Sequence, residues 1–402
     1  MPRVVLTSTF DLMGDRASQS AAINGTADFL NSYSYDADQR LTTVQQQQQT
    51  GGNAVAPKEV DFGYNALGQY TSIVYYNSLA GPRTDVATGA YSYDTGNRLT
   101  GLAYTSDGGA NKIDTFGWTY DNASLVTNFT DNDGTASYGY DPTNQLTSAT
   151  YTTSPGGHQP ANESFSFDLN GNRNSTGYAT GADNLMTSDG TFNYQHDADG
   201  NQTVRTRISN SYATDYRTTY SWDYRNRLTD VEYYDNNSVL TKHVHFVYGV
   251  FDYLIATEVD TTGGGSYNQI EHYVLDVSPE TPQAGVPGTA LAQPVLKFDG
   301  NGNPTERVLE ATDRIFAEGS VSSLTQADTV AWDVVDNLGS LRDVLDNSGK
   351  VIDHGVYSSF GQVVYASNPA VMHFTGFAGG HFDPTSGLEN EYHRWYDPAA
   401  GR

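Results

Sequence analysis

Cysteine is absent from this 402-residue chain, and basic residues are scarce. Without cysteine there is no disulfide framework and no thiolate metal site. The 21 Lys and Arg residues are outnumbered by 47 Asp and Glu, and the net charge of -26 repels nucleic acids and anionic membranes. No apolar stretch approaches the ~20 residues that a membrane helix needs. We therefore expect no nucleic-acid partner and no membrane span, and no secretion signal is visible near the N-terminus.

Glycine and aromatic residues are abundant instead, with 40 Gly, 29 Tyr and 16 Phe against 17% charged residues. Aromatic side chains suit pleated sheets and glycine suits turns, so this composition predicts an all-β protein rich in turns. One segment departs from the β pattern. In residues 307–316, Val308, Leu309, Ile315 and Phe316 have a spacing that predicts a short helix.

A short motif recurs along the first part of the chain, and its clearest copy is YSYDTGNRLT at residues 91–100. Tyr93 ends a half-buried strand, and the Asp94 carboxylate can accept hydrogen bonds from backbone amides two residues on. Gly96 and Asn97 tolerate positive φ, and Arg98 starts the return strand. The aromatic position of each copy, or of its close variant, is Tyr35, Tyr64, Tyr93, Tyr120, Tyr140, Phe167, His196 and Trp222.

The regular recurrence of the motif, about every 27 residues, indicates a repeat architecture. A two-stranded hairpin is marginal alone, so each unit can bury its aromatic residues only against its neighbours. We expect stacked hairpins that form a long, curved antiparallel sheet, with each Asp serving a turn rather than acid–base chemistry. The residues assigned to this structural role are Tyr35, Asp36, Tyr93, Asp94, Gly96, Arg98, Leu99, Tyr140, Asp141, Leu146, Trp222, Asp223, Arg227 and Leu228.

A second regularity follows the turns. Tyr104, Tyr151 and Tyr233 each lie five residues after the leucine of their repeat. Side chains alternate between the faces of a strand, so this odd offset puts these tyrosines on the face opposite the leucine. We expect the tyrosine-bearing face to be the wetter of the two.

The C-terminal residues carry further motifs. DNLGSLR at 336–342 and YSSFG at 357–361 precede a dense run, whose residues are Phe374, Gly376, Asp383, Gly387, Leu388, Tyr392, Arg394, Tyr396, Asp397, Pro398, Gly401 and Arg402. Together with the Tyr-Asp repeats, this run resembles the YD-repeat, or rearrangement-hot-spot (Rhs), family and its core signature. The resemblance covers residues 33–402 and divides the chain into an N-terminal lead-in (1–30), a YD-repeat array (31–278), a proline-rich loop (279–294) and an Rhs-associated core module (295–402).

The resemblance implies a hollow β-shell that encloses a C-terminal segment, often a toxin. We expect a non-enzymatic scaffold of a polymorphic toxin or of a secreted or cell-surface protein, with cargo or neighbouring shell segments as partners. The alternative is an adhesion module that binds glycans or a receptor, and a third interpretation is a fragment of a self-cleaving aspartyl protease. In self-cleaving members the catalytic aspartates follow the point where this sequence ends, so no catalytic residue is assigned. Complete shells are usually longer, which suggests the C-terminal part of a shell, a short relative or a truncated reading frame.

No cofactor or metal ion is predicted. Asp299 begins a stretch with the spacing of a calcium loop, but Pro304 replaces the glycine of its sharp turn, so a hairpin turn is favoured. His243 and His245 share one face of an expected strand, yet no third ligand is visibly placed beside them.

Overall fold

The computed structural model describes residues 1–402 except 82, 210–213, 278–292, 313, 372 and 392–393. Its first sheet has thirteen strands among these residues, and each pairs antiparallel with the next along the chain. The strands are β1 (Val4–Phe10), β2 (Arg16–Ile23), β3 (Thr26–Tyr35), β4 (Leu41–Gln48), β5 (Lys58–Tyr64), β6 (Tyr70–Tyr76), β7 (Asp85–Tyr93), β8 (Leu99–Ser106), β9 (Asn111–Tyr120), β10 (Val126–Asp131), β11 (Gly134–Tyr140), β12 (Leu146–Thr153) and β13 (Glu163–Ser164).

The second sheet has sixteen described strands in the same sequential order. They are β14 (Tyr178–Thr180), β15 (Met186–Asp189), β16 (Phe192–His196), β17 (Gln202–Arg207), β18 (Arg217–Trp222), β19 (Leu228–Tyr234), β20 (Leu240–Tyr248), β21 (Leu254–Asp260), β22 (Gln269–Asp276), β23 (Gln293–Asp299), β24 (Pro304–Ala311), β25 (Arg314–Ser320), β26 (Thr329–Val335), β27 (Leu341–Leu345), β28 (Val351–Tyr357) and β29 (Val363–Ala366). A small sheet holds β30 (His381–Asp383), β31 (Leu388–Asn390) and β32 (Trp395–Tyr396), and the 3-10 turns are Ala182–Asn184 and Phe377–Gly379.

The prediction of an all-β fold made of stacked antiparallel hairpins is confirmed. Among the described residues, no helix has the length and apolar character of a membrane span. The domain boundaries stay a prediction. β22 and β23 pair with each other on either side of the proline-rich loop, of which residues 279–292 lie outside the described part of the chain.

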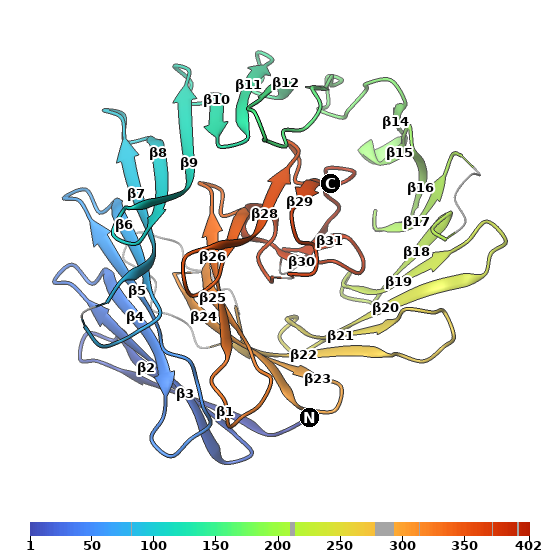
Figure 1. Cartoon of the computed structure of the whole chain (residues 1–402). Coiled ribbons are helices and arrows are strands. Elements are labelled where there is room, and N and C mark those ends of the chain that lie inside the picture. The colour runs from blue at the N-terminus through green and yellow to red at the C-terminus, as the bar shows by residue number, and fades with distance from the viewer. Residues whose placement is uncertain (82, 210–213, 278–292, 313, 372, 392–393) are drawn as a thin grey trace.

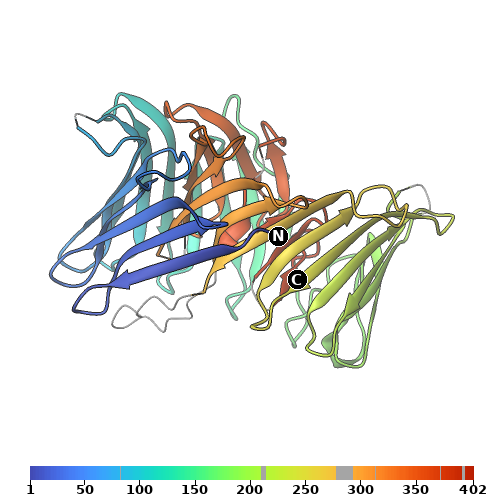
Figure 2. The ribbon, with the colours of Figure 1, turned by 90° about the horizontal axis from the view of Figure 1, so that it is seen from below.

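The strands form a curved outer wall around an inner layer (Figure 1). We use "outer wall" for β1–β22 and "inner layer" for β24–β32. Seen from below, the orange strands of the inner layer lie between the blue-to-cyan and the yellow-to-green strands of the wall (Figure 2). The start of the wall also meets its end, because Arg16 on β2 forms a buried ion pair with Asp276 on β22.

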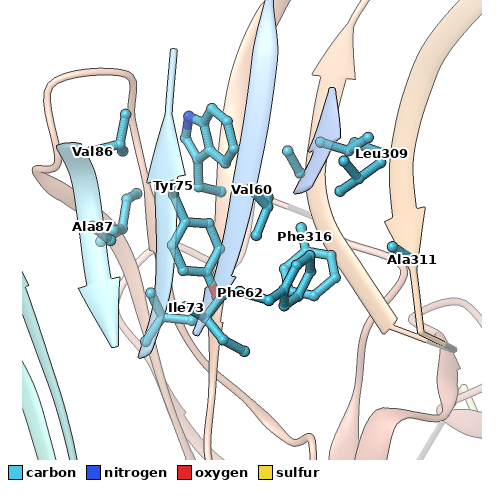
Figure 3. Close-up of a cluster of buried hydrophobic side chains, with 14 of the residues drawn as sticks. Val60, Phe62, Ile73, Tyr75, Val86, Ala87, Leu309, Ala311 and Phe316 are labelled. Carbon is cyan, nitrogen blue, oxygen red and sulfur yellow. The ribbon is translucent and has the colours of Figure 1, made fainter. Parts of the chain in front are cut away.

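Two strands of the inner layer, β24 and β25, are buried on both faces. Leu309 and Phe316 pack against the first part of the wall, as Figure 3 shows, and the Phe316 ring meets Phe62 edge-on at 5.4 Å. Their neighbours Val308 and Ile315 belong to the opposite cluster, with strands β18–β22. Both faces of β24 and β25 are therefore covered by other strands.

The predicted helix at residues 307–316 is wrong. These residues instead form most of β24 and the start of β25, which pair as an antiparallel hairpin. A strand covered on both faces carries apolar residues in succession rather than in alternation, so its sequence is easily mistaken for a buried helix.

The Tyr-Asp motif forms a five-residue turn with a fixed set of hydrogen bonds. Asp94 Oδ1 accepts the backbone N–H of Gly96 at 2.8 Å and of Arg98 at 2.9 Å, while Asp94 Oδ2 accepts Arg98 Nε at 2.7 Å. Asn97, rather than Gly96, adopts the left-handed conformation, with φ of 64°. The turns after Asp36, Asp141 and Asp223 repeat the backbone pattern. These carboxylates are committed to turns.

Successive turns are joined by the arginine and the tyrosine of the motif. The Arg98 guanidinium reaches the next turn, where it donates to Asp121 O at 2.9 Å and lies 4.8 Å from the Tyr120 ring centre. In return, the Tyr120 hydroxyl donates to Leu99 O at 2.6 Å. The same reciprocal contact joins Arg40 to Tyr64 and Arg227 to Tyr248. Related bonds to an earlier strand run from Tyr35, Tyr93, Tyr140 and Trp222.

The expectation of a wetter tyrosine face is wrong. Tyr104 is 0% exposed, and its hydroxyl donates to Val335 O in the inner layer. Tyr233 likewise donates to Ser386 O, and the Tyr151 hydroxyl lies 2.9 Å from Ser359 Oγ. This face is the concave side of the wall, and the inner layer covers it.

Four buried charges connect the wall to the inner layer. Lys58 Nζ lies 2.6 Å from Asp328 Oδ2, and Arg307 lies 2.8 Å from Asp28, with all four side chains 0% exposed. Arg307 also contacts Asp328 at 3.4 Å. Burial alone would raise the pKa of the Asp328 carboxyl, but the adjacent Lys58 lowers it. The charges compensate one another only when both layers are in place.

We predict that Tyr120→Phe lowers the free energy of unfolding by about 1 kcal/mol, because it removes one hydrogen bond between repeats and little else. Urea unfolding measures the change. Tyr224→Phe is the control, since Tyr224 is 91% exposed, and it is expected to have no effect. Equal effects of the two substitutions would contradict the proposed coupling.

We predict that Asp328→Asn lowers the free energy of unfolding by about 3–5 kcal/mol, because Lys58 and Arg307 lose a buried compensating charge. Chemical denaturation followed by tryptophan fluorescence tests this. Asp38→Asn alters a carboxylate whose side chain is 77% exposed, and it is expected to cost less than about 1 kcal/mol. A similar cost for both variants would rule out the buried cluster as a major link.

Candidate functional site

The C-terminal signature lies in the inner layer and begins in a loop that lies close to strands β25 and β30. Phe374 is 3% exposed, and its backbone N–H donates to Glu318 Oε1 at 2.7 Å. A Cβ at Gly376 would lie 2.7 Å from Phe382 Cβ, so this position requires glycine. The signature glycine therefore permits a close approach inside the molecule.

The middle of the signature forms the turn between β30 and β31. Asp383 Oδ1 accepts the backbone N–H of Thr385 and of Ser386, each at 2.8 Å. Gly387 completes the turn with φ of 73°, and Leu388 is 5% exposed. Burial raises the pKa of the Asp383 carboxyl despite these hydrogen bonds. Arg394 has an exposed side chain, and Tyr392 lies outside the described residues.

The last residues form a turn held against the inner face of the wall. Arg205 on β17 contacts Asp397 Oδ2 at 3.2 Å, and the Tyr396 hydroxyl donates to Phe360 O at 2.7 Å. Ala400 is buried in a cluster with Met186 and Tyr194. Pro398 is buried, and the backbone N–H of Asp397 donates to Arg402 O, which closes the turn. At Gly401 a Cβ atom would lie 2.9 Å from Arg173 Nη2.

Two hollows border these residues. One, of about 280 Å³, lies between the second sheet and the C-terminal turn, and its lining includes His196, Trp222 and Arg402. A larger one, of about 780 Å³, is lined by Lys297, Asp383 and other residues of the two layers. The C-terminal turn thus borders a partly open hollow on the concave side of the second sheet.

The family model of the Teneurin YD-shell matches residues 317–402. The structure of the Photorhabdus luminescens Tc holotoxin pore is similar to this chain, with a TM-score of 0.68 and 16% sequence identity. The alignment covers 99% of this chain and 20% of the chain in that structure. These matches show that the chain has the fold of a YD/Rhs-type shell. A crystal structure of TcdB2–TccC3–Cdc42 also aligns with 99% of this chain and with 20% of its matched chain, at a TM-score of 0.62 and 15% identity.

A curated relative of this chain is the double-stranded DNA deaminase toxin A of Burkholderia cenocepacia (strain H111). It is 26% identical over 256 residues, which are 60% of this chain and 17% of the toxin. The chain therefore spans about a fifth or less of the length of each of these three relatives. The predicted resemblance to the YD-repeat family is confirmed.

A charged seam between the wall and the inner layer was not predicted from the sequence. Arg342 on β27 contacts Asp131 of the wall at 2.7 Å, and His354 on β28 lies 2.8 Å from both Asp133 and Asp343. Burial and the nearby Asp343 raise the pKa of Asp114 to about 7. The only signal in the sequence is the segment DNDG at 131–134, which has more carboxylates than a turn needs.

The two metal hypotheses have different outcomes. Asp299 Oδ1 accepts the backbone N–H of Asn301 and of Asn303, so the suspected calcium loop is a hairpin turn, as favoured. The expectation that His243 and His245 lack a neighbouring ligand is wrong. Asp230, from the adjacent strand, lies within 2.9 Å of both rings, a contact that only strand register could reveal.

We predict that His354 stabilises the shell less as the pH rises. Burial alone would lower its pKa, but hydrogen bonds to Asp133 and Asp343 raise it to about 10. Because the folded-state pKa exceeds the ordinary value of 6.5, this stabilisation is complete below pH 6.5 and disappears as the pH rises through about 10. Urea unfolding of the wild type and of His354→Gln at several pH values measures it. A difference between them that stays constant or grows with pH would contradict this assignment.

Proposed function

We propose that this chain is a segment of a shell that encloses or presents a C-terminal cargo, as part of a polymorphic toxin or a secreted surface protein. One observation carries the proposal. The C-terminal turn is tied to the concave face of the wall by Arg205 and buries Ala400 there. A polypeptide that continues from Arg402 would therefore start on the enclosed side.

The relatives support the toxin context. The Tc holotoxin pore and the double-stranded DNA deaminase toxin A are toxins by name, and each aligns with this chain over part of its length. The fold itself consists of turns, sheet packing and buried ion pairs, which suits a scaffold. A secreted or extracellular location belongs to the same proposal.

Adhesion through tyrosine rings has less support, because Tyr104 and Tyr233 are buried and Tyr120 contacts the preceding repeat. Binding to a glycan array by the folded chain would revive it. A fragment of a self-cleaving aspartyl protease is the second candidate. The observation that favours it is the position of Asp383 beside the larger hollow, where burial raises the pKa of its carboxyl.

A protease-accessibility experiment tests the proposal that the chain encloses a C-terminal cargo. A flexible peptide with one cleavage site is attached directly after Arg402 or, as the control, directly before Met1. We predict that the site after Arg402 is cut several-fold more slowly in the folded protein and equally fast after denaturation. Arg205→Met, which removes the ion pair to Asp397, is expected to accelerate cleavage after Arg402 alone.

Equal cleavage of the two sites in the folded wild type would overturn the container proposal. Cleavage without added protease, lost in Asp383→Asn, would favour the self-cleaving candidate instead.

A further inference from the structure

Asp230, His243 and His245 form a compact group on the convex side of the second sheet, away from the C-terminal turn. On β20 the intervening residues Val244 and Phe246 are buried against the inner layer, so the two histidines point the other way. Asp230 on β19 lies directly opposite His245 in the strand register. Two neighbouring strands therefore deliver three polar side chains to one spot.

The donor atoms are already gathered as a metal ion requires. Asp230 Oδ1 lies 2.9 Å from His243 Nε2 and 2.8 Å from His245 Nδ1, and the three atoms lie within 4.8 Å of one another. A tetrahedral zinc ion with ligands at about 2.0–2.1 Å separates its donors by about 3.3 Å. The two distances from Asp230 Oδ1 to the histidine nitrogens would need to lengthen by only about half an ångström to admit the ion.

The surrounding charges favour a cation. Glu232 lies opposite His243 in the register, and Glu258 lies opposite His245 on the other side. Among the described residues, the ion pairs of Asp230 are with these two histidines, and none is with Lys or Arg. The other His–carboxylate groups differ, because Arg342 contacts Asp133 beside His354, and Lys297 approaches Glu318 beside His373. Those groups already contain a cation.

Access and orientation also suit a bound ion. The side chains of His243, His245 and Asp230 are 20%, 33% and 24% exposed, so the group is open to solvent yet held by its neighbours. The Tyr267 ring packs on both imidazoles, with its centre 5.4 Å from that of His243 and 6.0 Å from that of His245. This packing restricts the rotation of the two rings.

We propose that Asp230, His243 and His245 bind a divalent transition-metal ion, with Zn²⁺ as the favoured ion. Two imidazoles and one carboxylate are a common zinc ligand set, and the solvent side supplies the remaining position to water or to a donor group of a partner. The bound ion would join β19 to β20 on the outside of the shell, independently of what the shell contains.

The test measures Zn²⁺ binding to the metal-free 402-residue chain by isothermal titration calorimetry, with Co²⁺ absorption as a readout of coordination. The wild type is expected to bind one zinc ion and to gain thermal stability with increasing zinc. His243→Gln and His245→Gln are each expected to weaken binding by about 100-fold or more, since they remove a direct ligand. His272→Gln, on β22 in the same sheet, is the matched control and is expected to bind as the wild type does.

All three ligands lie on the outer face, and circular dichroism melting of the metal-free variants checks that they fold. The absence of stoichiometric zinc binding by the wild type would overturn the proposal. So would binding that survives the double substitution of His243 and His245, because the ion would then be held elsewhere.

Discussion

The structure depends on one constraint: a two-stranded hairpin has no partner for its aromatic face and must obtain one from the next hairpin. The Tyr-Asp motif meets this need with two kinds of bond. Its aspartate closes the local turn, and its arginine and tyrosine reach the neighbouring repeat, as between Arg98 and Tyr120. Each repeat is therefore stable only beside another repeat, and successive repeats form one long sheet.

The sheet of repeats has two faces, and the inner layer determines which of them is buried. Tyr104, Tyr151 and Tyr233 recur at one position of the repeat, and each places its hydroxyl beside a residue of the inner layer. The wall thus has a regular inner surface as well as regular turns. The same surface receives the C-terminal turn, which connects the architecture to the proposed role as a container.

Charges are distributed unevenly between these regions. Arginines such as Arg98 pair with the carboxylates of the turns, while others lie at contacts between layers, as with Arg307, Arg342 and Arg205. A buried ion pair adds little net stability over an apolar contact, but removing one of its two charges strongly destabilises the fold because the other charge stays buried without a partner. Such pairs therefore favour one docking of the inner layer over others.

The sequence by itself determined the all-β class, the repeat and the turn role of Asp94, because these depend on residues a few positions apart. It did not determine the strand pair at residues 307–316, where burial on both faces removed the alternation that marks a strand. Nor did it reveal the partners of Arg342 and His354 in the wall, or Asp230 beside the two histidines. Only the tertiary structure decided these contacts, because they depend on the curvature of the wall and on strand register, which bring together residues with no local relation in the chain.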